Sequence, residues 1–447
     1  MKKRILRAAA LLLSLACLVL PAAAAGEAVA LRGIAEDSVP DANGIGAAAV
    51  WNIENETFVY EHNIDAPLAP ASLTKLMTAV CAYEVLGGRM DETLTVEYGM
   101  IAAASGNQVG YYVGETVTVR DLFGGLLTRG ANDCAYLLAY AADGGTDAFV
   151  ARMNEKAAAL GMSATVYKNP TGMNAEGAVT TARDSIRVAA AFHAIPALTA
   201  LSSSVQYEMP ATNKAAARII YNRNALVSRV SETGYFDARV TGLNAGSTVE
   251  SGYYAASAVG SETLHYVIAV LGAVEAEGMN LAYTYTSKLA DYALSRFGYI
   301  EVIKAAGAVC ELPVTLSSTA DYVALVPATS LTLYLPLSTD VDTELVKTVR
   351  LDHESLEAPV EAGRAVGVYS VSRGGELLGS VDLVTKNALP RSEFLVVLRS
   401  IEDFTTGVFF LGTVAAAVVL TLLYFLIRAL MRRREGRRGA PRHYRSR

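Results

Sequence analysis

The chain has 447 residues, of which 52% are hydrophobic and 18% charged, and its formal net charge is -6. This length is sufficient for two or three domains with buried cores, and the acidic balance excludes general nucleic-acid binding. Three cysteines follow residue 25, none with CxxC spacing, and the five histidines are scattered. The sequence therefore predicts no disulfide framework, no metal site and no cofactor. Cys81 and Cys134 lie in apolar helical segments and are predicted to be buried thiols.

The first segment of the chain has the pattern of a targeting signal. Four basic residues lie within the first seven, an apolar run follows them, and residues 22–25 supply a small-residue cleavage region. Residues 1–25 are therefore predicted to be a secretory signal peptide, and residues 26–43 a polar, alanine-rich leader.

The last segment predicts a membrane anchor. Residues 405–427 carry no charge, and this length is enough to span a bilayer. Nine arginines lie among residues 428–447, and positive charge beside a span favours the cytoplasmic side. We therefore expect a single-pass protein of the cell membrane whose transmembrane helix contacts lipid. Residues 428–447 would form a basic cytoplasmic tail, and the acidic remainder of the mature chain would lie outside the cytoplasm.

Between these segments, the predicted order is strand, helices, strands and a final helix. The elements are a hairpin over 50–62, helices over 72–86, 119–142 and 149–160, a helix capped by Thr180 or Thr181, strands over 253–259 and 264–270, and a helix over 279–296. This order fits an α+β domain over residues 44–298 in which the first and last segments share one sheet. A domain boundary is expected at residues 298–304.

Short strands separated by glycine, proline and charged turns follow that boundary. They are expected at residues 312–316, 322–326, 331–335, 346–351, 365–371 and 377–383. The pattern predicts a small β-sandwich domain over residues 299–400. It contains no catalytic cluster, so we expect it to hold the first domain away from the membrane.

The segment that carries chemistry is Ser72-Leu73-Thr74-Lys75, the single Ser-x-x-Lys sequence in the chain. Pro70 precedes it and an apolar helical run follows, so Ser72 and Lys75 lie on one helical face, one turn apart. A buried lysine favours its neutral form and can take the proton that makes a serine hydroxyl nucleophilic. The alternative is structural, with Ser72 as a helix cap and Lys75 extending its amine towards solvent.

With these residues, the chain resembles the low-molecular-weight penicillin-binding serine D-alanyl-D-alanine carboxypeptidases. The similarity is strongest over residues 70–79, 153–184 and 356–384. It implies a β-lactamase/transpeptidase-like catalytic domain, a Ser72 acyl-enzyme and Lys75 as its base. A signal peptide and a C-terminal anchor also match the layout of that family.

The second motif of that family, Ser-x-Asn, is altered here. In the corresponding segment of this chain, Gly130 stands at the serine position and Asn132 is retained. The resemblance implies that Asn132 binds the substrate. A literal Ser105-Gly106-Asn107 occurs upstream, and we interpret it as a chance match. The chain therefore lacks the hydroxyl that would relay a proton.

The third motif, Lys-Thr-Gly, is altered further. The corresponding segment of this chain is Asn244-Ala245-Gly246, in which Ala245 replaces the threonine. Asn244 and Gly246 are expected to line the substrate-binding site. A competing register uses Arg239 and needs an insertion. Loss of the lysine removes a charge-assisted contact of roughly 1.5–3 kcal/mol, equivalent to about ten- to a hundredfold in kcat/KM. Arg239 or another arginine would have to compensate.

The function implied is a membrane-anchored serine carboxypeptidase of reduced activity, with peptidoglycan stem peptides as substrates and β-lactams as covalent inhibitors. The alternative is a catalytically inactive homologue that binds peptidoglycan or cell-wall enzymes. A third class, another serine hydrolase such as an esterase or a β-lactamase, has less support because the chain has no Gly-x-Ser-x-Gly sequence.

Overall fold

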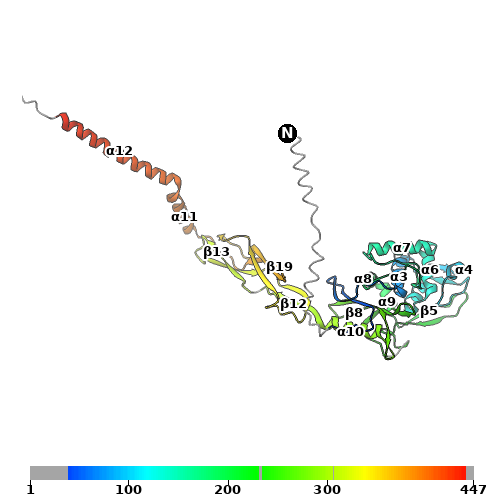
Figure 1. Cartoon of the computed structure of the whole chain (residues 1–447). Helices are drawn as coiled ribbons and strands as arrows, with labels where there is room; N and C mark the ends of the chain where they lie inside the picture. Colours follow the sequence, from blue (N-terminus) through cyan, green and yellow to red (C-terminus); the bar gives the residue numbers. More distant parts are fainter. Residues whose placement is uncertain (1–38, 231–233, 306, 439–447) are drawn as a thin grey trace, which may run out of the picture. The chain divides into compact units, whose positions relative to one another are not determined.

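The computed structural model describes residues 39–230, 234–305 and 307–438, with side chains described to residue 432 (Figure 1). The predicted signal peptide, most of the predicted leader and residues 439–447 lie outside this part of the chain. The chain divides into two compact units. The first contains Met1–Ile300 and Leu333–Glu344, and the second contains Glu301–Thr332 and Leu345–Arg447.

A five-stranded antiparallel sheet organises the first unit, with strand order β2-β1-β9-β8-β7. The strands are β1 (Ala47–Asn52), β2 (Thr57–His62), β7 (Val240–Thr248), β8 (Gly252–Gly260) and β9 (His265–Ala273). The N-terminal hairpin pairs with β9, so the predicted sharing of one sheet by the first and last segments is confirmed. Strand β7 lies at the edge of this sheet.

Helices cover both faces of the sheet. Alternate residues of β1 point to opposite faces, so Ala47 and Ala49 join one apolar core while Ala48 and Val50 join another. Helix α10 (Leu281–Arg296) packs in the second core. The first core holds α3 (Thr74–Leu86), α5 (Val119–Gly124), the π-helix η4 (Gly125–Arg129), α6 (Asn132–Asp143), α7 (Thr146–Ala159), α8 (Ala182–His193) and α9 (Pro196–Ser202).

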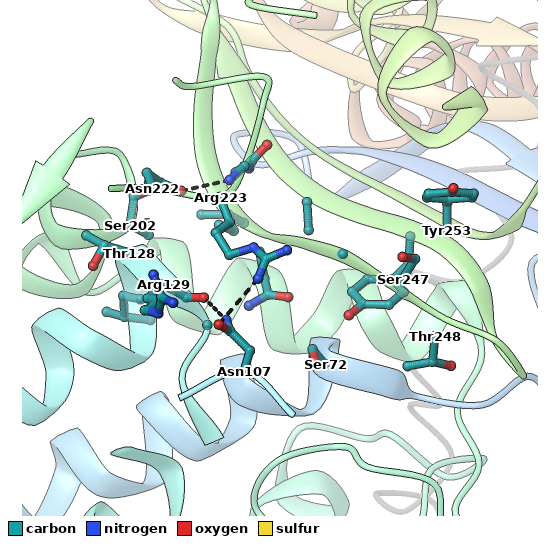
Figure 2. Close-up of a pocket in the computed structure, with 18 of the residues that line it drawn as sticks. Ser72, Asn107, Thr128, Arg129, Ser202, Asn222, Arg223, Ser247, Thr248 and Tyr253 are labelled. Atoms are coloured by element: carbon teal, nitrogen blue, oxygen red, sulfur yellow. Dashed lines mark hydrogen bonds between the residues drawn. The ribbon is translucent and has the colours of Figure 1, made fainter. Parts of the chain in front are cut away.

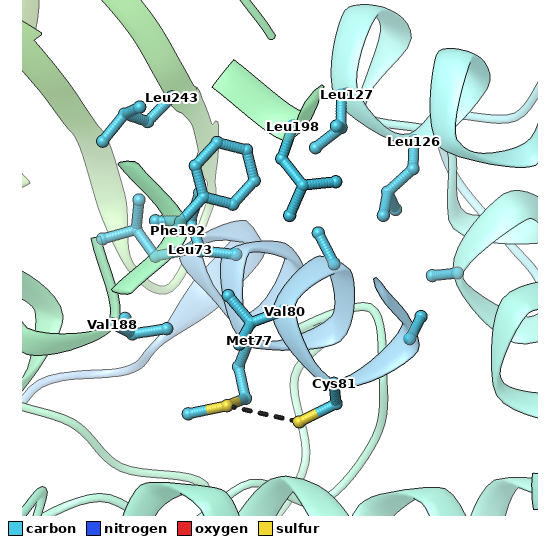
Figure 3. Packing of buried hydrophobic residues seen from close by; sticks show 14 of the residues in the cluster. Leu73, Met77, Val80, Cys81, Leu126, Leu127, Val188, Phe192, Leu198 and Leu243 are labelled. Carbon is cyan, nitrogen blue, oxygen red and sulfur yellow. Dashed lines mark hydrogen bonds between the residues drawn. The ribbon is translucent and has the colours of Figure 1, made fainter. Parts of the chain in front are cut away.

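Helix α3 is apolar on nearly every side and lies inside the first core. Figure 3 shows Met77, Val80 and Cys81 of this helix among side chains from the neighbouring segments. A helix that is hydrophobic all round is typical of a buried position. Cys81 and Cys134 are both buried, as predicted, and burial raises the pKa of the Cys81 thiol to about 12. The packing around α3 therefore restricts the movement of the residues at its start.

Several short elements of the first unit were absent from the sequence prediction. They are α9, helix α4 (Tyr98–Ile101) and the hairpin of β5 (Gln206–Met209) and β6 (Arg218–Tyr221). Between residues 93 and 119 lie the short paired strands β3 (Thr93–Thr95) and β4 (Thr116–Thr118). Strand β6 matters for function because the residues that follow it reach the site described below.

The second unit is all-β before its final helices, as predicted. Its sheet has the order β16-β18-β19-β14-β13-β17. These strands are β13 (Cys310–Thr315), β14 (Tyr322–Pro327), β16 (Val346–Leu351), β17 (Leu356–Glu357), β18 (Ala365–Arg373) and β19 (Glu376–Thr385). The division between the units after Ile300 falls within residues 298–304, where a boundary was expected. These residues lie largely in strand β12 (Phe297–Ile303), which pairs with β15 (Leu331–Pro336).

Helix α11 (Glu393–Thr406) and helix α12 (Val408–Arg438) end the described chain. In the part of the chain that the structure describes, Val408–Arg432 is long and apolar enough to cross a membrane. The apolar helix therefore begins three residues later than the predicted start of the span at residue 405 and runs five residues beyond its predicted end at residue 427.

Candidate active site

Ser72 lies at the turn that leads into helix α3. It is the middle residue of the short 3-10 helix η2 (Ala71–Leu73). Ala71 has a φ of 45°, in the left-handed region that residues other than glycine rarely adopt. Ser72 is partly exposed and lines a cavity of about 510 Å³. The predicted nucleophile is therefore accessible, and a strained turn presents it.

Lys75 extends back from the first turn of α3 to Ser72. Its Nζ lies 2.8 Å from the Ser72 Oγ and 2.7 Å from the backbone oxygen of Thr171. The side chain is 1% exposed, and this burial lowers the pKa of Lys75 from 10.5 to about 7. Among the described residues, no carboxylate forms an ion pair with this amine. At neutral pH a large fraction of Lys75 is therefore uncharged and able to accept the Ser72 proton.

The turn over residues 169–172 packs directly against the serine turn. Gly172 has a φ of +76°, and a Cβ atom there would lie 1.7 Å from the backbone oxygen of Ala71. Only glycine fits this contact, because any side chain would collide with main-chain atoms. The close approach brings the Thr171 carbonyl to the Lys75 amine. The turn therefore positions the amine that faces Ser72.

Gly130 and Asn132 both line the cavity. Gly130 ends the π-helix η4 with a φ of 69° and carries no hydroxyl. Asn132 is 4% exposed, and its Nδ2 donates to the backbone oxygen of Ser105 at 2.6 Å. Its Oδ1 has no hydrogen-bond partner, although a buried polar atom usually has one. The Asn132 Oδ1 is thus a buried acceptor without a donor among the described residues.

The upstream segment Ser105-Gly106-Asn107 lies beside Asn132, which the sequence prediction did not foresee. The backbone N–H of Asn132 donates to the backbone oxygen of Asn107 at 2.7 Å. Gly106 and Asn107 are among the residues that line the cavity. The segment therefore forms part of the cavity wall and supports Asn132. Its interpretation as a chance match did not predict a position in the site.

Strand β7 brings Asn244, Ala245 and Gly246 to the cavity that Ser72 lines. Asn244 is 7% exposed, and its Oδ1 lacks a hydrogen-bond partner. Arg239, the basis of the competing register, forms ion pairs with Asp237 and Asp291 at 2.7 and 2.5 Å. These carboxylates occupy Arg239 away from the cavity lining, so Arg239 does not supply a cation there.

Arg223 is a cation of the cavity that the sequence prediction did not name. It follows strand β6, its side chain is exposed, and its Nη1 donates to the Asn107 Oδ1 at 3.3 Å. Figure 2 shows this side chain extending between strand β7 and the helix that carries Ser72. Among the described residues, none forms an ion pair with Arg223. The sequence signal was an arginine between two asparagines after a short strand, which gives no indication of a cavity.

Tyr254 of strand β8 is a second cavity residue that was missed. Aromatic residues are enriched in strands, so a tyrosine in a predicted strand gives no indication of a functional role. Only the strand pairing reveals which face Tyr254 occupies.

Comparison with known proteins gives concordant matches. Residues 38–275 match a family model described as D-alanyl-D-alanine carboxypeptidase, and residues 299–391 match the C-terminal domain of penicillin-binding protein 5. The carboxypeptidase DacF of Bacillus subtilis is 26% identical over 361 residues, which are 79% of this chain and 88% of the relative. DacA of Escherichia coli is 26% identical over 75% of this chain and 81% of its own.

A solved structure of penicillin binding protein 5 from Haemophilus influenzae shares the fold. It matches 80% of this chain and 100% of its own chain, with a TM-score of 0.56 and 20% identity.

Proposed function

This chain belongs to the D-alanyl-D-alanine carboxypeptidase family, and from that membership we propose that it removes terminal D-alanine from peptidoglycan stem peptides through a Ser72 acyl-enzyme. Ser72 is the nucleophile and Lys75 is the base. Asn132, Asn244 and Gly246 contact the substrate. β-Lactams are covalent inhibitors because their strained amide acylates the same hydroxyl.

The reaction proceeds in two acyl-transfer steps. Neutral Lys75 takes the Ser72 hydroxyl proton as Oγ bonds to the carbonyl carbon of the penultimate residue. The C–N bond then breaks, and the departing D-alanine amine receives the proton from Lys75. In the second step Lys75 accepts a proton from water, which attacks the ester, and Ser72 regains its hydroxyl proton.

The observation that carries this proposal is the contact between Lys75 and Ser72. The 2.8 Å distance, the absence of an ion-pair partner among the described residues and the lowered pKa of the amine together meet the requirements for a general base. If Lys75 were only a surface residue of α3, its amine would be exposed rather than buried.

We assign binding of the terminal carboxylate to Arg223. The family motif has a lysine where this chain has Asn244, and an amide cannot supply positive charge. Arg223 reaches the same cavity, is free of ion pairs with described residues, and can pair with a carboxylate through two N–H groups. Asn132 and Asn244 offer their unpaired Oδ1 atoms to N–H groups of the peptide.

The remaining parts of the proposal concern location. Helix α12 anchors the chain in the cell membrane, and the arginines of residues 428–447 place the C-terminal tail in the cytoplasm. Residues 44–298 then form an extracytoplasmic catalytic domain, and residues 299–400 form the domain between it and the anchor. Residues 1–25 serve as the export signal.

The full-length protein in detergent, incubated with a D-Ala-D-Ala pentapeptide and with fluorescent penicillin, tests the proposal. We expect release of D-alanine and a covalent mass increase, both absent from Ser72→Ala. An Arg223→Gln variant should raise KM for the peptide about ten- to a hundredfold, since one charge-assisted contact is lost. Lack of D-alanine release above the Ser72→Ala background would reject the carboxypeptidase assignment.

A second candidate function is a non-catalytic protein that binds peptidoglycan on the same scaffold. Gly130 and Asn244 favour it, because the site lacks a hydroxyl and a cation that the family motifs contain. This candidate predicts reversible binding of muropeptides with no covalent adduct on Ser72. The penicillin mass measurement therefore discriminates between the two functions.

A further inference from the structure

The wall segment Ser105-Gly106-Asn107 carries a side-chain amide that no step of the proposed reaction uses. Asn107 is partly buried and lines the cavity. Its Nδ2 donates to the backbone oxygen of Arg129, and its Oδ1 accepts from the Arg223 Nη1 at 3.3 Å (Figure 2). The Arg129 carbonyl can only accept and the Arg223 guanidinium can only donate. These two partners therefore fix which end of the Asn107 amide faces Arg223.

The main chain that carries this amide is itself bound to the start of helix α6. The backbone oxygen of Asn107 accepts from the N–H of Asn132 at 2.7 Å. The buried carboxylate of Asp133 accepts from the backbone N–H groups of Val109 and Gly110 at 3.1 and 2.8 Å. The Asn107 amide therefore projects from a backbone that is held on both sides of it.

Arg223 is attached to the same end of the π-helix η4 as Asn107. Its backbone N–H donates to the Thr128 oxygen at 3.1 Å, and Asn107 contacts the oxygen of the next residue, Arg129. The bonds thus close a ring from η4 through Asn107 and Arg223 back to η4. An exposed arginine without such a contact samples many rotamers, and ordering it weakens ligand binding. The ring keeps the guanidinium ordered before a ligand arrives.

The bond to Asn107 uses Nη1 and leaves the Nε and Nη2 edge of Arg223 open. Three other arginines of the chain, Arg120, Arg152 and Arg183, each bind a carboxylate through Nε and Nη2 at 2.6–3.2 Å. In the described part of the chain, no group accepts a hydrogen bond from the Nε or Nη2 of Arg223. The edge that suits a carboxylate is therefore the one left for a ligand.

We propose that Asn107 is a positioning residue, which holds the Arg223 guanidinium in the cavity with its Nε and Nη2 edge open to the terminal carboxylate of the substrate. The inference rests on the proposed function, in which Arg223 binds that carboxylate. It assigns to the site peptides that end in a free carboxylate, in preference to peptides that end in an amide.

The position of the Asn107 amide also relates to the altered motifs. A Cβ atom at Gly130 would lie 3.6 Å from the Asn107 Nδ2, so the glycine that replaces the motif serine lies beside this amide. Asn244, which replaces the motif lysine, lines the same cavity. Asn107 and Arg223 together supply an ordered cation to a cavity in which both motifs have lost a functional group.

The test measures the dissociation constants of a D-Ala-D-Ala pentapeptide and of the same peptide with a C-terminal amide. The proteins are full-length Ser72→Ala, which binds without turnover, and the same protein with Asn107→Leu, Asn107→Asp or Arg223→Gln added. Gln108→Leu is the matched control, because it removes an amide of the same segment whose Nε2 donates to the Ala104 oxygen at 3.2 Å. Thermal unfolding checks that each variant is folded.

We expect Asn107→Leu to weaken binding of the carboxylate peptide about three- to tenfold, because the guanidinium must then be ordered during binding. Asn107→Asp should weaken it about ten- to a hundredfold, as Arg223→Gln does, because the introduced carboxylate pairs with Arg223 and competes with the ligand. Binding of the amide peptide should change less than about twofold, and Gln108→Leu should leave both peptides unaffected. With Ser72 intact, Asn107→Leu should raise KM and leave kcat nearly unchanged.

A double variant separates positioning from a general structural role. In an Arg223→Gln background, Asn107→Leu should have no further effect on the carboxylate peptide, since the group that it positions is gone. A loss that persists in that background, or equal weakening of both peptides, would overturn the inference. Parent-like binding by a folded Asn107→Leu protein, or equal affinity of the Ser72→Ala protein for the two peptides, would also overturn it.

Release of D-alanine by the protein with Ser72 intact distinguishes this inference from the proposed function. Release together with any of these contrary outcomes overturns the role of Asn107 while the proposed function stands. The expected binding pattern without release rejects the hydrolase and keeps the positioning role. If the protein neither binds the pentapeptide nor releases D-alanine, both fail.

Discussion

Two sides of the cavity differ in what holds their groups in place. The serine side comprises Ser72, Lys75 and the turn 169–172, and its polar groups are bonded to each other or to main-chain atoms. The strand side comprises Asn132 of α6 and residues 244–247 of β7. It contains two buried Oδ1 atoms, of Asn132 and Asn244, that have no partner.

This difference indicates that the serine side forms the acyl bond and that the strand side selects the substrate. A network bonded through the main chain is already complete in the free protein, which is what preorganised catalysis needs. Unpaired buried acceptors are unfavourable in the free protein and gain partners when a ligand with N–H groups binds. We therefore expect changes on the serine side to affect the chemical step and changes on the strand side to affect binding.

Removing the amine of Lys75 should have the largest effect. Lys75→Met keeps the side-chain volume and should lower the penicillin acylation rate by about 10²–10⁴-fold, because the general base is lost. The same variant should unfold at a higher temperature, since folding buries this amine. Lys156→Met, which removes an amine paired with Glu84 on the surface, is the control and should leave acylation unchanged. A Lys75→Met protein that acylates at the parent rate would contradict the assignment of the base.

The pH dependence follows from the lowered pKa of Lys75, about 7. Only the neutral amine accepts the Ser72 proton, so the acylation rate should fall about tenfold per pH unit below 7 and level off above it. The folded pKa is below the unfolded one, so between pH 7 and 10.5 the unfolded state binds more protons. The contribution of Lys75 to the free energy of unfolding should therefore increase with pH across that window. Stopped-flow acylation from pH 5 to 9 checks the rate, and a rate that still rises tenfold per pH unit at pH 9 would exclude a lowered pKa.

A side chain at Gly172 tests the main-chain contact of the serine side. Gly172→Ala should lower the free energy of unfolding by about 2–4 kcal/mol and slow acylation, because its Cβ meets the Ala71 oxygen. Gly177→Ala is a matched control. Gly177 has the same φ of +76°, but a Cβ there meets only the end of the Lys168 side chain, whose Cε would lie 3.3 Å away. We expect this control to lose about 1 kcal/mol, the effect of the left-handed φ alone, and to acylate normally. Equal losses in urea unfolding would show that the contact with Ala71 is unimportant.

The smallest expected effect is on the strand side, where a lysine can be restored. Asn244→Lys alone should change KM for a D-Ala-D-Ala peptide less than about threefold, because Arg223 already binds the carboxylate. In an Arg223→Gln background the same substitution should recover about tenfold in KM, since one charge-assisted contact returns. If the effects of Asn244→Lys and Arg223→Gln on KM are additive, the side chains at these two positions do not bind the same carboxylate.

The serine side could be predicted from the sequence because its chemistry is local. Ser72 and Lys75 are three residues apart in a helical segment, and the apolar residues around them predict burial. Tyr254 could not be predicted because the register of β7 and β8 shifts between Gly242 and Asn244. Such an irregularity changes which residues face each other and leaves no trace in the pattern of strand residues. Arg223 was missed because a loop, not a motif, brings it to the cavity.

The partner of Lys75 in the turn 169–172 is a carbonyl of the main chain, and this has an evolutionary consequence. The turn is closed by the Asn169 Oδ1, which accepts from the backbone N–H groups of Thr171 and Gly172 at 3.1 and 2.7 Å. A carbonyl is present whatever side chain position 171 carries, so that position can drift without displacing the amine. Insertion or deletion of a single residue in the turn would instead move the carbonyl away, and lineages of this protein should vary at position 171 but not in the length of the turn.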